Sequence, residues 1–275
     1  MSRARAAARF AATAVLLPPL LPGAVGPAAA AVPPPPPNDH IAEAIVVPGL
    51  PFSDSEDTTS ATTDRTDPTE CFGNAETVWY RFTPDATGDV QADTFDSDYD
   101  TTLSVWVGRA DALELVACND DYRSLQSRVR FTATSGTPYW IMVGSLVPSD
   151  EPRSLVFSMA ALPPPIDLRV SIKSTGTLHD AGVATVRGSV SCSRPVDLVV
   201  VGSVRQGWRR PPAVGWFSLS VGCSGFARWT ATTPGETNSF APGGARVGLS
   251  ASGVDEAREE PTRRFAAHAV TLSRP

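Results

Sequence analysis

Apolar and polar residues alternate along most of the chain, a pattern that predicts β-strands throughout. In the first half, turn residues such as Pro, Asp, Gly and Ser separate the alternating runs. The strands predicted there lie at residues 76–83, 90–92, 103–107, 113–117, 128–132, 138–144 and 154–160. One short helical turn is expected between Asn38 and Val46. Many short strands at regular spacing are typical of a β-sandwich.

The second half has the same pattern and predicts a second sandwich. Its seven strands are expected at residues 167–173, 183–191, 196–204, 216–221, 226–232, 246–252 and 264–272. Seven strands with a cysteine near the second and the fourth indicate an immunoglobulin-like sandwich. We expect Trp216, Phe226 and Trp229 to fill its core or line its edge, because large aromatic side chains mostly serve burial. The whole chain is therefore predicted to be all-β.

The beginning of the chain is predicted to be a secretory signal peptide. Arg3, Arg5 and Arg9 precede an apolar stretch, and small residues follow as far as Ala31. The expected organisation is a signal peptide at 1–31, a proline-rich linker at 32–37, a sandwich at 38–162, a linker at 163–165 and a sandwich at 166–275. We expect a monomer that is secreted to the extracellular space and has no membrane contact after cleavage.

The four cysteines are predicted to form two disulfides. An even number of cysteines in an oxidising compartment favours pairing, and a proline-rich linker separates the second cysteine from the third. The expected pairs are therefore Cys71 with Cys118 and Cys192 with Cys223. None of them forms a CxxC motif and the histidines are scattered, which argues against zinc.

Charge is distributed unevenly between the two halves. Residues 38–163 contain 21 acidic and 7 basic residues, whereas residues 166–275 contain 8 acidic and 13 basic residues. The acidic half argues against nucleic acid as its partner. The basic residues Arg205, Arg209 and Arg210 in the second half are typical of a solvated strand end.

Two acidic clusters, at residues 93–100 and 119–121, flank a predicted hairpin and form the candidate site. If Val107 opposes Glu114, the same register places Asp100 opposite Asp121, with side chains about 5 Å apart. Two such carboxylates repel by roughly 3 kcal/mol at an effective dielectric constant near 20. A calcium ion would relieve this repulsion, because calcium accepts many flexible oxygen ligands.

The candidate calcium ligands are Asp96, Asp98, Asp100, Asn119, Asp120 and Asp121. The alternative is a solvated acidic loop, because Asp and Asn are common turn residues and the EF-hand spacing is missing. Asp120 or Asp121 would in that case pair with nearby arginines.

Three aromatic residues near the acidic end are candidates for stacking on a sugar: Tyr99, Trp106 and Tyr122. Core packing of Trp106 on the other face of its strand is an equal alternative.

No catalytic residue is predicted, because the sequence has neither a G-x-S-x-G nor an H-E-x-x-H motif. The function expected is a non-catalytic accessory protein that binds an extracellular polymer or protein. The alternatives are a structural two-module spacer or interaction protein and, more remotely, a hydrolase.

Several motifs in order along residues 38–160 resemble the bacterial pre-peptidase C-terminal domain family. They are Asn38-Asp39, 50–53 (LPFS), 77–82 (TVWYRF), 98–101 (DYDT), 117–121 (ACNDD), 127–129 (SRV) and 136–144 (GTPYWIMVG). The resemblance implies a jelly-roll sandwich in a secreted accessory module, and some relatives bind calcium or matrix polymers. In that family the module usually accompanies a catalytic domain and comes last; here it comes first, so proteolysis is not carried over.

Residues 166–275 resemble a domain of unknown function from secreted proteins of high-GC bacteria, through 186–192, 223–225 and Trp229. This second resemblance implies no activity.

Overall fold

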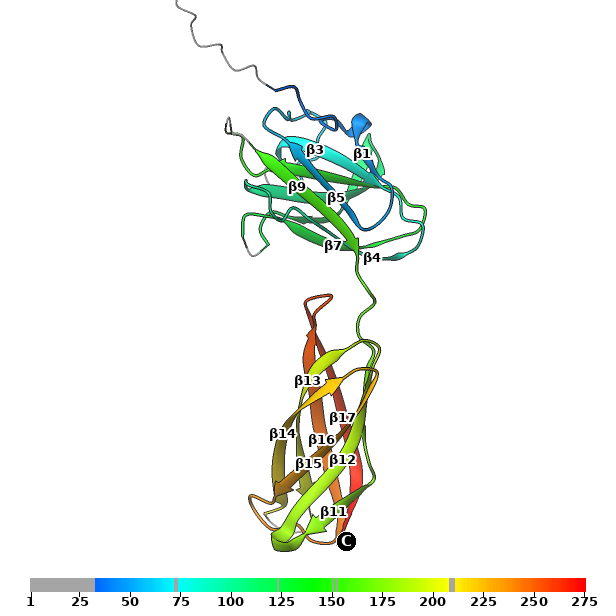
Figure 1. Cartoon of the computed structure of the whole chain (residues 1–275), viewed down its shortest axis with the longest axis vertical. Helices are drawn as coiled ribbons and strands as arrows, with labels where there is room; N and C mark the ends of the chain where they lie inside the picture. Colours follow the sequence, from blue (N-terminus) through cyan, green and yellow to red (C-terminus); the bar gives the residue numbers. More distant parts are fainter. Residues whose placement is uncertain (1–32, 72–73, 123, 150, 152, 208–210) are drawn as a thin grey trace, which may run out of the picture. The chain divides into compact units, whose positions relative to one another are not determined.

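The computed structural model shows an all-β protein, as the sequence predicts (Figure 1). It describes residues 33–71, 74–122, 124–149, 151, 153–207 and 211–275, so the predicted signal peptide lies outside the described residues. The helical segments in the described part are two 3₁₀ turns, Ile41–Glu43 and Asp180–Gly182. The first turn falls where the sequence predicts one. In the described ranges, no helix has the length and apolar character needed to cross a membrane.

Two sheets form the sandwich in the first half of the chain. One sheet has the order β1-β3-β8-β5-β6 and the other β2-β9-β4-β7. The strands are β1 (Ile45–Val47), β2 (Phe52–Asp57), β3 (Ala75–Phe82), β4 (Gly88–Asp93), β5 (Thr101–Arg109), β6 (Ala112–Asn119), β7 (Arg128–Ala133), β8 (Tyr139–Ser145) and β9 (Ser154–Ala161). Strands β1 and β2 were not predicted, because one is only three residues long and the other is rich in Ser, Asp and Glu.

Strand β3 is buried on both faces. Val78, Tyr80 and Phe82 point into the core between the two sheets, as their alternation predicts. On the opposite face Trp79 packs with Trp106 and Met142 in a second, smaller cluster, and Ile41 of the 3₁₀ turn lies against it. The segment before β1 therefore covers part of the outer face of this sheet.

A single curled sheet of eight strands surrounds the core in the second half of the chain. Its order is β10-β12-β11-β17-β16-β13-β14, and β15 pairs with β12. The strands are β10 (Leu168–Ile172), β11 (Thr175–His179), β12 (Val183–Cys192), β13 (Val196–Gln206), β14 (Ala213–Cys223), β15 (Phe226–Pro234), β16 (Gly243–Asp255) and β17 (Glu260–Ser273). Strand β11 links the two layers, since it is antiparallel to β12 and parallel to β17. The layers β10-β12-β15 and β17-β16-β13-β14 have the arrangement of an immunoglobulin-like sandwich.

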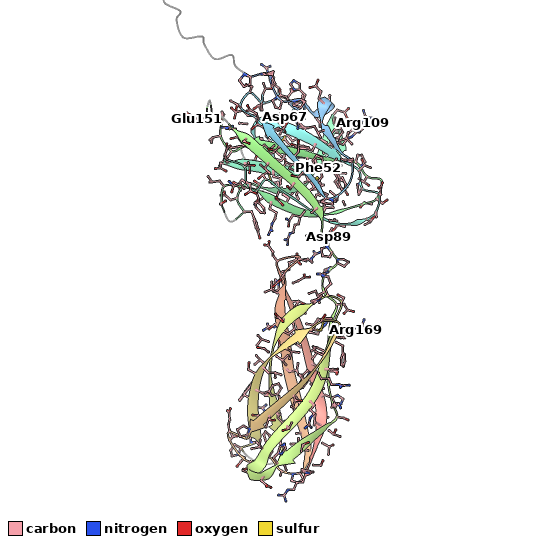
Figure 2. The ribbon with its side chains drawn as sticks, in the orientation of Figure 1. Phe52, Asp67, Asp89, Arg109, Glu151 and Arg169 are labelled. Carbon is pink, nitrogen blue, oxygen red and sulfur yellow. A yellow bond between two sulfur atoms is a disulfide. The ribbon has the colours of Figure 1, made fainter. Side chains whose placement is uncertain are left out.

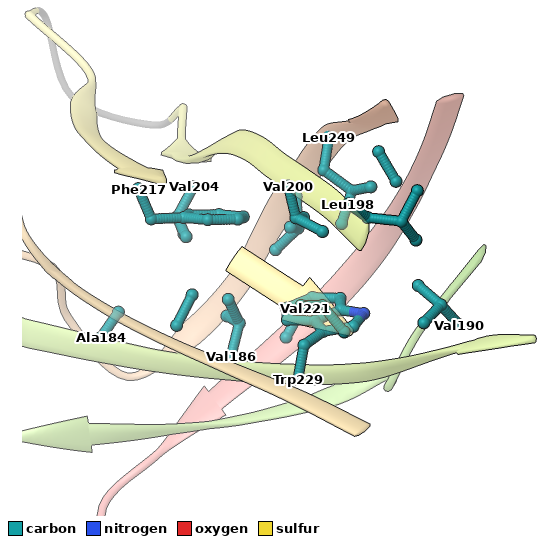
Figure 3. Packing of buried hydrophobic residues seen from close by; sticks show 14 of the residues in the cluster. Ala184, Val186, Val190, Leu198, Val200, Val204, Phe217, Val221, Trp229 and Leu249 are labelled. Atoms are coloured by element: carbon teal, nitrogen blue, oxygen red, sulfur yellow. The ribbon is translucent and has the colours of Figure 1, made fainter. Parts of the chain in front are cut away.

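The three aromatic residues expected to fill the second core or line its edge have different positions. Trp229 is buried, with Phe217 stacked beside it at 6.1 Å between ring centroids, among the aliphatic side chains in Figure 3. Trp216 is 61% exposed and Phe226 is 57% exposed. Core packing is therefore wrong for Trp216 and Phe226, because the alternation of β14 and β15 turns them outward. Both strands lie at the end of their layer, which agrees with the alternative that these residues line the edge.

Both predicted disulfides are confirmed. Cys71 is bonded to Cys118 and Cys192 to Cys223, with Cα–Cα distances of 6.0 Å and 6.2 Å. Each disulfide closes a loop within one sandwich, which agrees with an extracellular protein.

Candidate functional site

The hairpin of β5 and β6 forms as predicted, but its register is shifted near the acidic end. Val107 opposes Glu114 as expected. The same register would place Asn119 opposite Thr102, but Asn119 lies opposite Leu103. A β-bulge next to Val105 and Trp106 leaves Val116 as an extra residue in β6. Arg109 marks the turn of this hairpin in Figure 2, and the acidic clusters lie at the opposite end of its strands. The last pair of this ladder is Leu103 with Asn119, and β5 itself begins at Thr101, so Asp100 and Asp121 lie outside the ladder.

The six candidate ligands do not form one group. The carboxylate of Asp98 accepts a hydrogen bond from the Ser154 amide at 2.8 Å, which holds it at the start of β9. Asp98 there lines a depression of about 350 Å³ with Asp57 and Arg153. Asp96 has a left-handed backbone, with φ of 69°, and its charge acts on Asp93. A turn at residues 95–96 and a bend at residues 98–99 therefore precede β5 in place of an extended strand.

Asn119 organises the loop after β6 through its side chain. Its Nδ2 donates to the carbonyl of Asp121 at 2.9 Å, and its Oδ1 accepts from the Arg128 amide at 3.0 Å. Ser127 Oγ lies within 3.1 Å of the carbonyl oxygens of Asn119 and Asp120. Several oxygens near the acidic end are therefore already used in holding the loop.

Asp100, Asp120 and Asp121 remain close enough to affect one another. The Oδ1 atom of Asp100 is buried and has no hydrogen-bond partner among the described residues. This desolvation raises the pKa of Asp100, and the charges of Asp121 and Asp120 raise it further. The predicted repulsion between the two acidic clusters is thus present, centred on Asp100.

These residues fit a calcium site only in part. Across the described ranges, no group of three or more His, Cys, Asp or Glu side chains is arranged to hold a metal ion. Calcium takes six to eight oxygen ligands, and Asp98 and Asn119 already have other partners. Binding would require Asp100, Asp120 and Asp121 to move together around the ion.

The three aromatic candidates near this end are engaged within the fold. Trp106 is 1% exposed and its Nε1 donates to Ser104 Oγ at 2.8 Å, so the prediction that it stacks on a ligand is wrong. Tyr99 packs against the first core, and its burial raises the pKa of its hydroxyl to about 12. The Arg128 guanidinium lies 3.5 Å from the centroid of the Tyr122 ring, and the Tyr122 hydroxyl donates to Glu259 at 3.2 Å.

A buried polar network lies beside the first core, around the Asn38-Asp39 motif of the sequence. Asn38 is fully buried, and its Nδ2 donates to Glu56 at 3.1 Å and to the Trp79 carbonyl at 3.2 Å. The Tyr80 hydroxyl lies 2.8 Å from the same Glu56 oxygen. Desolvation raises the pKa of Glu56. Asn38 thus attaches the first segment of the sandwich to β2 and β3.

Another surface that the sequence interpretation missed is the outer face of the layer β17-β16-β13-β14. Trp216 in β14 and Phe265 in β17 are 61% and 70% exposed, and both line one depression of about 460 Å³. The signal was available, since the buried residues Phe217 and Val221 fix an alternation that turns Trp216 outward. We call this surface the aromatic face, defined by Val201, Ser203, Arg205, Trp216, Ser218, Arg246, Gly248, Ser250, Phe265 and Ala267.

Comparisons with known proteins give no family for this chain. No protein-family model matches it, and no curated protein matches it. Among solved structures, similarity is found to the β-glucuronidase of Parabacteroides merdae, with 10% identity, a TM-score of 0.25, and coverage of 71% of this chain and 27% of that chain. Red sea bream transglutaminase gives 9% identity, a TM-score of 0.25, and coverage of 82% and 32%. This chain thus spans about a third or less of those proteins, and TM-scores this low indicate neither a shared architecture nor a shared activity.

Proposed function

We propose that this is a secreted, non-catalytic protein that binds an extracellular polymer. The observation that carries the proposal is the aromatic face, where two large apolar rings are exposed on a shallow sheet surface. Large exposed apolar groups on a stable frame are typical of interaction sites. The two disulfides support an extracellular location, and the resemblance of residues 38–160 to secreted accessory modules agrees with it.

The positions of the histidines favour binding over hydrolysis. His40 Nδ1 lies 3.3 Å from Asp64, and His179 Nε2 lies 2.9 Å from Thr185 Oγ1. His268 is exposed in β17. The three histidines thus lie in separate elements, whereas acid–base catalysis needs groups that converge on one substrate atom.

A depletion assay tests the proposed function. The secreted protein is incubated with cellulose, chitin, pectin and bacterial envelopes, and the protein left in the supernatant is measured. We expect depletion by at least one polymer, with no release of reducing sugar and no cleavage of casein. Full recovery from every polymer, or release of sugar or peptide in proportion to protein, would contradict the proposal.

We further propose that calcium stabilises the first sandwich. The unpartnered oxygen of Asp100 and its raised pKa support this, because a cation would neutralise the charges of Asp120 and Asp121. Millimolar calcium is then expected to raise the melting temperature of the intact secreted protein, and Asp100→Ala with Asp121→Ala to abolish the rise. If calcium leaves the melting temperature of the wild type unchanged, calcium does not stabilise this protein; the proposed binding function does not depend on that result.

A further inference from the structure

The aromatic face contains two parallel rows of residues that cross four strands. In one row Trp216 lies opposite Ser203, Ser203 opposite Gly248, and Gly248 opposite Ala267. In the next row Phe265 lies opposite Ser250, which in turn opposes Val201. Neighbouring strands are about 4.8 Å apart, so three strand spacings separate the two aromatic residues by roughly 14 Å across the sheet.

Small residues lie between the two rings. Ser203, Gly248 and Ala267 form the floor of the depression that Trp216 and Phe265 line. A Cβ atom added at Gly248 would meet no atom within 4 Å, so the backbone there is open to the outside. The surface thus has an aromatic ring at each end and a lower centre, where the half-exposed Val201 lies beside the hydroxyl-bearing Ser203 and Ser250. A continuous apolar patch, such as protein partners usually bury, would have its large side chains in the middle.

The charge of this surface is positive. Arg205 and Arg246 oppose each other directly on β13 and β16, in the row next to Trp216. Neither arginine forms an ion pair with another described residue. Like charges directly opposite on adjacent strands are unfavourable, and a bound anion would relieve this. The outward positions around them, from Val199 to Arg205 and on the facing strands, carry no acidic residue.

At the Phe265 end a third arginine adds to the positive charge. The Arg263 guanidinium lies 5.2 Å from the Phe265 ring centroid, and its Nε donates to Ser250 Oγ at 3.1 Å. Cationic groups therefore accompany both aromatic rings.

We propose that the aromatic face binds a linear polysaccharide whose sugar rings carry carboxylate groups. The proposal rests on the proposed binding function and names its ligand class and its site. Sugar rings pack with their C–H faces on Trp216 and Phe265, because the face of an aromatic ring attracts partly positive hydrogen atoms. The carboxylates accept hydrogen bonds from Arg205 and Arg246, whose planar guanidinium groups match carboxylate geometry. The chain crosses the four strands, and hydroxyls of Ser203 and Ser250 face it.

Native affinity electrophoresis of the intact secreted protein tests this proposal, with polygalacturonate as the anionic probe and dextran as the neutral one. Polygalacturonate is expected to retard the protein, and dextran is not. Trp216→Ala and Phe265→Ala each weaken the retardation about tenfold. Gly248→Leu abolishes it by filling the floor, at a position where the backbone is not strained.

Two further variants separate charge from stacking. Arg205→Ser with Arg246→Ser weakens retardation and removes most of its dependence on salt. Phe226→Ala removes an exposed aromatic side chain from β15, outside the aromatic face, and is the matched control that binds as the wild type. Circular dichroism of each variant confirms that the sandwich is folded.

The outcomes separate the two proposals. If polygalacturonate retards the Trp216→Ala and Gly248→Leu variants as strongly as the wild type, the site is elsewhere; the inference is then overturned, and the binding function stands. Equal retardation by dextran and polygalacturonate also overturns it, because the arginines then contribute nothing. A wild-type protein that is not retarded by polygalacturonate but dimerises through Trp216 overturns it in favour of a second copy of the chain. If the depletion assay is also negative for every polymer, the proposed function fails with it.

Discussion

Removal of the Cys71–Cys118 disulfide, by Cys71→Ser with Cys118→Ser, is expected to destabilise the first sandwich and leave the second unchanged. The two cysteines are 47 residues apart in the sequence. The loop-closure entropy that this cross-link removes from the unfolded chain corresponds to about 4 kcal/mol at 25 °C. The separation of 31 residues between Cys192 and Cys223 gives about 3.7 kcal/mol for the other disulfide. Typical domains are stable by only about 5–15 kcal/mol, so either loss is large.

Urea unfolding monitored by tryptophan fluorescence measures both losses. Trp79 and Trp106 are buried in the first sandwich and Trp229 in the second, so each half has its own reporter. Since the two halves have separate cores, we expect two transitions. The Cys71→Ser, Cys118→Ser variant shifts only one of them, and the Cys192→Ser, Cys223→Ser variant shifts only the other.

Two results would contradict the expected effect of this disulfide. A loss below about 1 kcal/mol in the first variant would mean that the cross-link does not restrict the unfolded chain as the entropy argument requires. An equal shift of both transitions would mean that the two halves unfold together, against the predicted division at residues 163–165.

Three other changes test particular contacts. Asp100→Asn is expected to raise the melting temperature in EDTA, because it removes repulsion from neighbouring carboxylates, and to abolish any calcium shift; the exposed control Asp85→Asn should do neither. The raised pKa of Glu56 means that its contribution to stability is full below its ordinary value of 4.5 and is lost as the pH rises through the folded-state pKa. Glu56→Gln should therefore reduce the pH dependence of the free energy of unfolding, measured by urea titration between pH 4 and pH 7. A pH dependence equal to that of the wild type would mean that burial does not raise the pKa of Glu56. Trp106→Ala should lower the free energy of unfolding by about 3–5 kcal/mol, because the side chain is fully buried, without weakening retardation by polygalacturonate.

Most strands were predictable because each turns one face to a core. The alternation at 76–83 and 196–204 gives β3 and β13 closely, since inward residues must be apolar. Besides β2, strands β1 and β11 were missed. Each is short and is held mainly by pairing with its neighbours, which leaves little trace in the hydrophobic pattern. The disulfides were predictable because a linker separates the two pairs.

The candidate site was predicted less well, for reasons that are local to it. The hairpin and its turn were correct, but one extra residue, Val116, shifts the register on the side toward Asn119. The backbone turns before β5, and Asp98 accepts a hydrogen bond from the Ser154 amide at the start of β9. Such a hydrogen bond produces no periodic pattern of apolar residues from which it could be predicted. The alternation of β5 allowed Trp106 either to be exposed or to be buried on the outer face of its sheet. It is buried because Ile41, from the segment before β1, packs over that face. The sequence of β5 alone does not show that this segment lies there.

Iodide quenching of tryptophan fluorescence measures whether a carboxylated polysaccharide lies on the aromatic face. Trp216 is the exposed tryptophan among the residues that the structure describes. Iodide is therefore expected to quench the Trp216 emission, isolated as the difference between the wild type and Trp216→Phe. Added oligogalacturonate should protect this emission in a saturable manner. If oligogalacturonate binds while the quenching of Trp216 stays unchanged, the ligand does not lie on the aromatic face, which contradicts the proposed site.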